Sequence, residues 1–317
     1  MNWGILGLGR IAHRFASSLE KSHDVFYAGA SHTEEKRASF SKKYHPIHMY
    51  STYEELLDAP DVNVIYIALP HKFHYEWTMK CLKHNKHVLV EKPAFLTSQE
   101  ALNISSYASA HNLFFMEAMK TRFIPLIHRL HEIIDEKIIG EIESIDCNFT
   151  FPQPENQLAI SYFYDSVMGG ALYDTGIYCI DFINDFIDDE IIDMKINTHF
   201  CEHIDLNDKV LFQFKNHTTA SFECGMTNEN KRYGIIKGTK GSIYLDNFYR
   251  PTHAIISTIE SKRSIEIPLI VDDFYGEIQA VDAAIMNAQI ESTRMSHQDT
   301  IQSITILENL HHKLKEG

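Results

Sequence analysis

Polar residues follow one stripe of an otherwise apolar segment near the middle of the chain. The segment GGALYDTGIYCIDF (Gly169–Phe182) begins a predicted helix, whose polar stripe contains Asp174, Tyr178, Asp181 and Asp185. The remaining sides are apolar, so the helix is expected to be buried. Two interpretations remain open. The acids and the tyrosine are hydrogen-bonded core residues, or they line a cleft where they can exchange protons with a substrate.

A glycine-rich turn follows the first apolar run of the chain. Its sequence GLGRIA (Gly7–Ala12) opens a helical pattern. A dinucleotide site needs a tight turn at Gly7, close approach of the pyrophosphate at Gly9, and a small residue at Ala12 for packing of helix on strand. The glycines alone are equally compatible with a structural turn, but their place between a strand and a helix favours a dinucleotide.

The end of the second predicted strand bears on the choice between NAD and NADP. Binding of the NAD ribose requires an acid there, and Asp24 precedes this strand instead of closing it. The strand ends at Ser31 and His32, and Lys36 follows. A hydroxyl and an ammonium can hold a 2′-phosphate, which favours NADP. The alternative is that Ser31 only caps the next helix and that one of the two following glutamates turns inward.

A lysine follows another predicted strand in EKP (Glu91–Pro93). Ligands of parallel sheets bind at the carboxyl ends of their strands. Lys92 could therefore bond substrate oxygens, stabilise a developing alkoxide and lower the pKa of a neighbouring acid. An isolated lysine is more often solvated, so it is the position beside the predicted nucleotide that makes Lys92 a candidate.

Two histidine pairs have a spacing that metals can use, His71 with His74 and His128 with His131. No third ligand stands at a suitable spacing, so no metal site is expected. His74 is expected to form hydrogen bonds near the cofactor, and packing at a helix start is its alternative role.

The elements that must position these residues form two patterns. Up to about residue 118, short apolar runs alternate with helical patterns, which is typical of βαβ units. Beyond residue 140, strands alternate polar and apolar side chains, as in an antiparallel sheet with one packed face. The predicted fold class is α/β, with an N-terminal Rossmann dinucleotide-binding domain at 1–119. A C-terminal α+β substrate and oligomerisation domain at 120–317 is expected to contain a large, mostly antiparallel sheet, and its helical tail, 277–317, could pack back on the first domain.

Composition limits the classes of partner. The 317 residues carry a net charge of −14 and the pI is 5.7, which argues against nucleic-acid binding. Five cysteines without a CxxC pair fit reduced thiols in a cytoplasmic protein. There is no targeting segment, and no apolar run approaches the ~18 residues of a membrane-spanning helix. We therefore expect a cytoplasmic protein with no membrane partner.

Several motifs in this order resemble those of the Gfo/Idh/MocA oxidoreductases. They are GLGRIA, ALPHKFH, EKP, MEAMKTRFIP, GGALYDTGIY and GTKGSIYL, and they span nearly the whole chain. MEA with TRF and DTGIYCI most resembles the branch of dimeric dihydrodiol dehydrogenases and NADP-dependent D-xylose dehydrogenases. The inositol dehydrogenases of the family usually carry histidine in place of Tyr178.

The resemblance implies a role for each matching residue. Lys92 would be the catalytic lysine and Tyr178 the acid/base, while Asp174 would bind substrate or orient the pair. A phenol titrates near ~10 in water, and positive charge from a lysine and an oxidised nicotinamide favours its ionised form. The cofactor, NADP or NAD with NADP preferred, would be bound by Gly7, Leu8, Gly9, Arg10, Ile11, Ser31, His32, Lys36, Leu69, Pro70, His74, Glu91 and Lys92.

The resulting hypothesis is hydride transfer between a nicotinamide and a hydroxyl or carbonyl carbon of a sugar, polyol or cyclic diol. A homodimer or higher homo-oligomer is expected from the exposed sheet face, as in the relatives. The chain departs from the family at His71, where asparagine is common, and it lacks an arginine before the double glycine. These departures, and the loop at 151–168 that would read stereochemistry, leave the substrate open. The alternatives are an NAD-dependent glycosidase of the same superfamily and a non-catalytic sensor of sugar or NADP.

Overall fold

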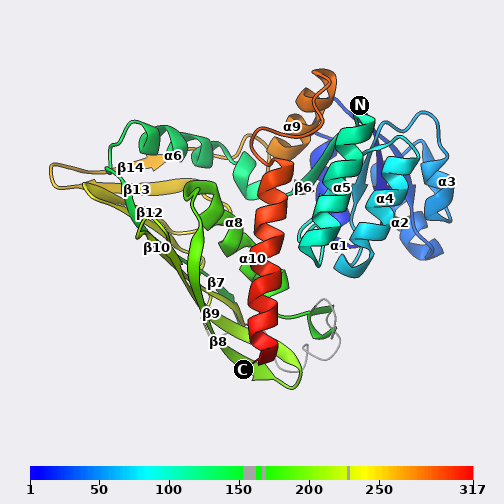
Figure 1. Cartoon of the computed structure of the whole chain (residues 1–317). Coiled ribbons are helices and arrows are strands. Elements are labelled where there is room, and N and C mark those ends of the chain that lie inside the picture. Colours follow the sequence, from blue (N-terminus) through cyan, green and yellow to red (C-terminus); the bar gives the residue numbers. More distant parts are fainter. Residues whose placement is uncertain (153–161, 166–168, 227–228, 317) are drawn as a thin grey trace. The chain divides into compact units, whose positions relative to one another are not determined.

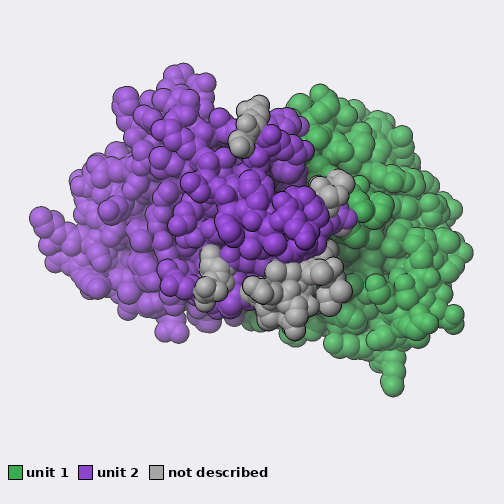
Figure 2. All heavy atoms as spheres, turned by 90° about the horizontal axis from the view of Figure 1, so that it is seen from below, with its two compact units in different colours: residues 1–120, 270–304 green, residues 121–269, 305–317 purple. Residues whose placement is uncertain are grey.

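The computed structural model describes residues 1–152, 162–165, 169–226 and 229–316 (Figure 1). The chain divides into two compact units, coloured separately in Figure 2. Unit 1 contains residues 1–120 and 270–304, and unit 2 contains residues 121–269 and 305–317. From the sequence, the domain boundary was predicted at residue 119, with a helical tail at 277–317 that could pack back on the first domain. In the structure this tail is divided, because residues up to 304 belong to unit 1 and the rest to unit 2.

Unit 1 contains a six-stranded sheet in the order β3-β2-β1-β4-β5-β6. All of its strand pairs are parallel, and this order confirms the predicted Rossmann fold. The strands are β1 (Asn2–Leu6), β2 (Val25–Ala30), β3 (His48–Tyr50), β4 (Val64–Ile67), β5 (His87–Glu91) and β6 (Phe115–Ala118).

Helices connect these strands. They are α1 (Arg10–Leu19), α2 (Glu34–Tyr44), α3 (Tyr53–Leu57), α4 (His74–Lys83) and α5 (Ser98–His111), with short 3₁₀ turns η1 (His71–Phe73) and η2 (Lys120–Phe123). Helix α9 (Tyr275–Met286) and the first residues of α10 (His297–Glu316) also belong to unit 1. The sequence analysis predicted neither β3 nor α3. Strand β3 is only three residues long, and α3 begins at a capping box formed by Thr52 and Glu55.

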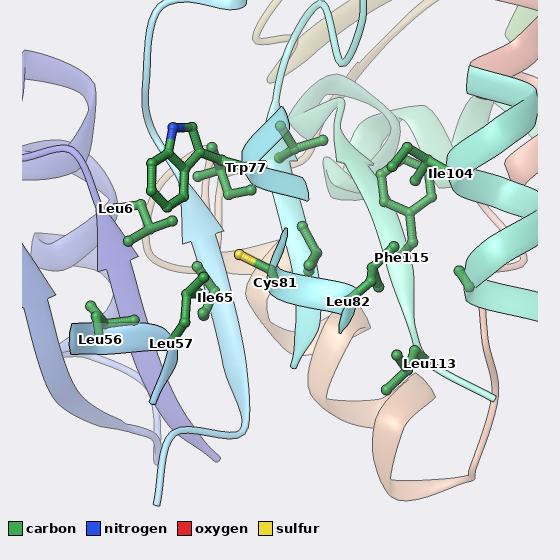
Figure 3. Close-up of a cluster of buried hydrophobic side chains, with 14 of the residues drawn as sticks. Leu6, Leu56, Leu57, Ile65, Trp77, Cys81, Leu82, Ile104, Leu113 and Phe115 are labelled. Carbon is green, nitrogen blue, oxygen red and sulfur yellow. The ribbon is translucent and has the colours of Figure 1, made fainter. Parts of the chain in front are cut away.

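The core of unit 1 lies between helices and the sheet. In Figure 3, Trp77, Cys81 and Leu82 from α4 pack over the strands that carry Leu6 and Ile65. Each fully buried large apolar side chain stabilises the fold by about 1.5–3 kcal/mol. This packing fixes the strands, and therefore the loops at their carboxyl ends.

Unit 2 contains an eight-stranded sheet in the order β14-β13-β12-β11-β7-β10-β9-β8. Strands β7 and β10 pair in parallel and the other neighbours are antiparallel, as predicted. The strands are β7 (Ile142–Phe151), β8 (Ile191–Cys201), β9 (Ile204–Phe214), β10 (Thr219–Met226), β11 (Gly234–Gly238), β12 (Gly241–Leu245), β13 (His253–Thr258) and β14 (Lys262–Glu266). The helical elements of this unit are α6 (Pro125–Asp135), a 3₁₀ turn η3 (Tyr162–Tyr164), a π-helical turn η4 (Leu172–Gly176), α8 (Ile177–Phe186) and the rest of α10.

The two faces of this sheet differ. Ile145, Cys147 and Phe149 of β7 are buried on the face against which α8 packs. On the opposite face, Leu211 of β9 and Tyr244 of β12 remain exposed. The alternation seen in the sequence thus gives one packed and one open face.

All five cysteines are free thiols. None of the described helices is both long enough and apolar enough to cross a membrane.

Candidate active site

The turn between β1 and α1 leaves the start of the helix open. Gly7 has a φ of +87°, and a Cβ there would lie 2.7 Å from the carbonyl oxygen of Ala68. A Cβ on Gly9 would meet no heavy atom of the described chain within 4 Å. Among the described residues no side chain caps α1, and its first turn contains no acid. The first N–H groups of α1 can therefore receive an anion from outside the chain.

The residues next to this turn divide into packing and exposed positions. Leu8 and Ala12 are buried, Ile11 is half-buried and Arg10 is exposed. Ala12 has no exposed surface, as expected for a helix that lies close to its strand. Arg10 and the backbone from Gly7 to Ile11 thus remain the cofactor-binding candidates here.

An arginine of α2 that was not singled out from the sequence contacts the end of β2. Arg37 of α2 donates from Nη1 to the carbonyl oxygen of Ser31 at 2.5 Å. The hydroxyl of Ser31 accepts from the N–H of Thr33 at 3.3 Å, and Thr33 itself is the N-cap of α2. His32 and Lys36 are exposed. Arg37 stands in the first half of α2, where its spacing from the strand end could have identified it.

The two glutamates that open α2, Glu34 and Glu35, are also exposed. Neither glutamate turns inward towards the end of β2. Asp24 lies at the opposite end of β2, where it pairs with the N-terminal ammonium of Met1 at 2.6 Å.

His74 connects the loops that follow β4 and β5. It is fully buried, and its Nδ1 lies 2.9 Å from the carbonyl oxygen of Pro93 while Nε2 lies 2.8 Å from that of Leu69. Burial lowers the pKa of His74, although both carbonyls favour the protonated ring. A neutral imidazole donates to one oxygen only. The position of His74 fixes Leu69, the exposed Pro70 after it, and Pro93.

Two buried carboxylates anchor the main chain around Lys92. Glu91 accepts from the hydroxyl of Tyr66 and, at 3.2 Å, from the N–H of Lys92. Glu117 accepts from the N–H of Ala94 at 2.9 Å. Lys92 itself is half-buried, and the peptide between it and Pro93 is cis. The backbone that carries the candidate lysine is therefore held on both sides.

The helix of Tyr178 begins at a glycine that another side chain encloses. Gly170 has a φ of +98°, and a Cβ there would lie 1.8 Å from Oδ1 of Asp205. Oδ2 of Asp205 accepts from the N–H of Leu172 at 2.9 Å. Burial raises the pKa of Asp205 and, together with the charge of Asp205, raises the pKa of Asp208 to about 8. The start of this helix is thus occupied by a carboxylate of the chain itself.

The first turn after Gly170 is π-helical, and α8 continues from Ile177. Isolated π turns inside helices often mark functional sites. Asp174 lies in this turn and is half-buried, whereas Tyr178 lies at the start of α8 and is 4 % exposed. Both candidates therefore come from one short, irregular helical segment.

The two other acids of the polar stripe are core residues. Asp181 accepts from Nε of Arg122 at 2.8 Å, and both side chains are buried. Asp185 lies 3.9 Å from the same guanidinium and 2.9 Å from Nε2 of His131. Asp181 and Asp185 are therefore bonded within the core, which was the first of the two interpretations of the stripe. Only Asp174 and Tyr178 remain candidates for chemistry.

Aromatic rings surround Tyr178. Its ring centroid lies 5.7 Å from that of Phe149 and 4.5 Å from that of Tyr249, and the latter pair is T-shaped. We call Phe149, Tyr178 and Tyr249 the aromatic cluster. Cζ of Arg232 lies 5.2 Å from the ring centroid of Phe149, and Cζ of Arg250 lies 4.7 Å from that of Tyr249. The sequence analysis missed both arginines because no local motif marks them.

The predicted cofactor residues of unit 1 gather at one edge of its sheet. The turn at residues 7–11, the segment 31–36, the loop from Leu69 and the pair at 91–92 all follow the carboxyl ends of parallel strands. This edge is where such sheets bind ligands. The described residues contain no group of three or more histidine, cysteine or acidic side chains suited to a metal ion. Residues 153–161 and 166–168, within the loop expected to read stereochemistry, lie outside the described residues.

Two family models match the chain. One is described as an oxidoreductase family with an NAD-binding Rossmann fold and matches residues 1–119. The other is described as a GFO/IDH/MocA C-terminal domain and matches residues 127–244. Their order and spans follow the two sheets.

Curated relatives and solved structures agree with these models. Trans-1,2-dihydrobenzene-1,2-diol dehydrogenase from Xenopus laevis is 28% identical and covers 96% of each chain. The enzyme of the same name from Danio rerio is 26% identical, over 95% of this chain and 92% of its own. An aldose-aldose oxidoreductase from Caulobacter crescentus, solved with glycerol, has a TM-score of 0.89 at 18% identity, over 100% of this chain and 98% of its own. A 3-ketoreductase from Actinomadura kijaniata, solved with NADP and TDP-benzene, has a TM-score of 0.87 at 24% identity, over 98% and 97%.

Proposed function

The chain belongs to the Gfo/Idh/MocA oxidoreductase family, and from this we propose that it transfers a hydride between NADP(H) and a hydroxyl-bearing carbon of a sugar, polyol or cyclic diol. The observation that carries the proposal is the uncapped start of α1 after Gly9, at the carboxyl edge of the sheet that also carries Lys92. An open helix start at this edge suits a pyrophosphate, and Lys92 lies at the end of a strand in the same sheet.

The cofactor fits unit 1 through specific groups. The backbone from Gly7 to Ile11 would bind the pyrophosphate, because a glycine at position 9 leaves space there and the helix start favours negative charge. Leu69 and Pro70 would border the nicotinamide, with His74 holding their loop in place. Glu91 would accept from the ribose that carries this ring. When bound, the nicotinamide supplies the hydride chemistry.

We propose NADP over NAD because of the charges at the end of β2. The guanidinium of Arg37, the exposed Lys36 and His32, and the hydroxyl of Ser31 can together hold a 2′-phosphate.

The two candidate catalytic residues would act on the substrate oxygen. Tyr178 would take the proton of the substrate hydroxyl in oxidation and return it in reduction. Lys92 would donate a hydrogen bond to a substrate oxygen and stabilise negative charge that develops there. Asp174, in the turn before Tyr178, orients the substrate.

The substrate class follows from what related proteins are named for. The curated relatives are dehydrogenases of a cyclic diol, and the structural neighbours are a 3-ketoreductase and an aldose-aldose oxidoreductase. Each of these names describes chemistry at a hydroxyl or carbonyl carbon. We therefore assign the same kind of carbon to the substrate of this chain.

The deciding experiment follows reduction of NADP⁺ and NAD⁺ by nicotinamide absorbance with a panel of aldoses, inositols and diols. We expect turnover with NADP⁺ preferred. Tyr178→Phe and Lys92→Met should each lower kcat by about 100-fold or more, because proton transfer and charge stabilisation typically contribute that much. Binding of NADPH, followed by its fluorescence, should persist in Tyr178→Phe.

Two substitutions away from the proposed sites serve as controls for this experiment. Tyr107→Phe removes a half-buried phenol from α5, and Lys83→Met removes an exposed ammonium from the end of α4. Both should keep wild-type turnover. Wild-type turnover in Tyr178→Phe or Lys92→Met would show that the assigned role of that residue is wrong, and binding of NADPH without turnover on any substrate would favour a sensor.

We also propose that two copies associate through the open face of the unit 2 sheet. A row of side chains in neighbouring register crosses this face. Tyr244 lies beside both Ile235 and Ile255, and Asp146 and Ser221 stand between Ile235 and Leu211. Leu211 is 46% exposed and Tyr244 is 40% exposed. Exposed apolar side chains in such a row are typical of association surfaces. Sedimentation equilibrium of the purified protein gives the mass that checks this.

A further inference from the structure

A guanidinium lies beside the aromatic cluster of Phe149, Tyr178 and Tyr249 and has no role in the reaction proposed above. Cζ of Arg232 stands over the ring of Phe149 at 5.2 Å, and Phe149 contacts the ring of Tyr178. Arg232 is thus separated from the candidate acid/base by one aromatic ring. A cation over an aromatic face is held in place by the ring, so the fork of Arg232 has a defined position.

The surroundings of Arg232 leave part of its hydrogen-bonding capacity unused. Its Nε is buried and meets no acceptor among the described residues, although the side chain as a whole is half-buried. Arg232 pairs through its backbone with Asn247, whose buried Oδ1 also meets no donor there. A buried polar group left without a partner destabilises a protein. Nε of Arg232 is such a donor and Oδ1 of Asn247 is such an acceptor, and a polar ligand could bond to both.

Other arginines of the chain make ion pairs with carboxylates of the protein. Arg14 pairs with Asp273 at 2.5 Å, Arg122 with Asp181 at 2.8 Å and Arg129 with Glu132 at 2.6 Å. No ion pair with Arg232 is formed within the described part of the chain. An anion that binds Arg232 would therefore come from outside the described chain.

A second positive charge lies on the other side of the cluster. Nη2 of Arg250 donates to the hydroxyl of Tyr249 at 3.1 Å, and its Cζ lies 4.7 Å from the centroid of that ring. The chain as a whole has a net charge of −14. Two guanidiniums thus lie next to the same three rings in a chain of negative net charge, and their positive charge attracts negative ligands.

We propose that the substrate of this site carries an anionic group, a carboxylate or a phosphate, and that Arg232 binds it. The planar fork of arginine matches the two oxygens of either group, and the charge-assisted bonds are strong. Oδ1 of Asn247 accepts from a neighbouring substrate hydroxyl. This inference rests on the proposed function, because it places the anion relative to Tyr178, and it narrows the substrate to an anionic sugar or polyol derivative.

The test compares three sugars that share the same reacting end. They are D-glucuronate, D-glucose 6-phosphate and D-glucose, assayed with NADP⁺ for wild type, Arg232→Met and Arg232→Lys. Wild type should favour one anion over glucose in kcat/KM. Arg232→Met should lose about 10- to 100-fold on that anion and stay within twofold on glucose, which is the size expected for a lost charged hydrogen bond. Arg232→Lys should recover part of the loss.

The preferred anion identifies the group, since glucuronate presents a carboxylate and glucose 6-phosphate presents a phosphate. Arg263→Met is the matched control, because it removes the same charge from an exposed position on β14. This variant should behave as wild type towards all three sugars. An equal loss on all three sugars in Arg232→Met, or a wild type that favours neither anion, would overturn the proposal.

A binding measurement separates this inference from the proposed function. Calorimetric titration of the NADP⁺-loaded protein with glucuronate and with glucose 6-phosphate should give binding of one anion that Arg232→Met abolishes and Arg263→Met retains. Such binding without turnover would end the dehydrogenase proposal and keep the anion site. Turnover on neutral sugars without Arg232-dependent binding would end the anion-site proposal and keep the dehydrogenase proposal. If neither turnover nor such binding is found, both proposals are overturned.

Discussion

Two helices of this protein begin after a pair of glycines, and the two starts differ in what faces their N–H groups. Helix α1 of unit 1 begins after Gly7 and Gly9, with no side-chain cap among the described residues. The helix of Tyr178 in unit 2 begins after Gly169 and Gly170, and Asp205 accepts from its N–H at Leu172. One start is open to an external anion, and the other already holds an anion of the chain.

The difference shows that glycines before a helix do not define a ligand site by themselves. Both starts concentrate N–H groups and attract negative charge. In unit 2 that charge is a carboxylate from β9, so this helix start serves to position Tyr178. In unit 1 none of the described side chains caps the helix start, so a phosphate can take its place. The decisive feature is the side chain opposite the turn, which comes from a distant part of the sequence.

The largest effect is expected from Gly170→Ala. A Cβ there would lie 1.8 Å from Oδ1 of Asp205, and the φ of +98° disfavours any side chain. The substitution should lower the free energy of unfolding by more than about 3 kcal/mol, because it combines a steric clash with backbone strain and loss of the cap at Leu172. Urea denaturation followed by circular dichroism measures it. A stability within about 1 kcal/mol of wild type would mean that Asp205 does not fill this helix start.

Gly9→Ala, in contrast to Gly170→Ala, should leave stability nearly unchanged and weaken the binding of the cofactor. Its Cβ would meet no heavy atom of the described chain within 4 Å, and its φ of −88° suits alanine, so stability should change by less than about 1 kcal/mol. The methyl group would stand where the pyrophosphate is proposed to approach. The Kd for NADPH, measured by fluorescence titration, should therefore rise by about 10-fold or more, a loss of about 1.4 kcal/mol or more. Unchanged NADPH binding would place the cofactor elsewhere.

The open start in unit 1 could be predicted from sequence because all of its determinants are local. Gly7, Gly9 and Ala12 stand within one short segment between a strand and a helix. The β-strands around them are continuous apolar runs, which is the pattern of a sheet covered on both faces. Their order and the parallel pairing follow from the alternation with helices, so the fold of this unit was correctly predicted apart from the short β3 and α3.

The closed start in unit 2 could not be predicted because its partner is remote. Asp205 reads as a polar residue of an alternating strand, and no local pattern connects it with Gly170. Likewise, Asp181 looked like a possible member of a cleft until its ion pair with Arg122 was visible. Arg232 reaches the ring of Phe149 only through the register of the sheet. Side-chain pairings across strands depend on tertiary structure, which spacing along one segment does not encode.

The smallest effect, counted for each pH unit, concerns the carboxyl behind the closed start. Burial and the charge of Asp205 raise the pKa of Asp208 to about 8 in the folded protein, compared with 3.8 as the ordinary value. Between about pH 4 and 8 the folded state therefore binds a proton that the unfolded state has lost, and the free energy of unfolding falls as pH rises through this window. The decrease amounts to at most about 1.4 kcal/mol for each pH unit.

Asp208→Asn should remove this dependence, because the amide is neutral throughout and its oxygen can still accept from the hydroxyl of Thr198, which lies 2.6 Å from Oδ1 of Asp208. The free energies of unfolding of wild type and variant, measured in urea from pH 5 to 8, should therefore diverge, with the variant relatively more stable at the alkaline end. Asp193→Asn changes an acid on β8 whose side chain is 50% exposed, and its curve should run parallel to that of wild type. Parallel curves for Asp208→Asn as well would mean that Asp208 is ionised beside Asp205 at neutral pH, so that the helix of Tyr178 would begin against two negative charges instead of one.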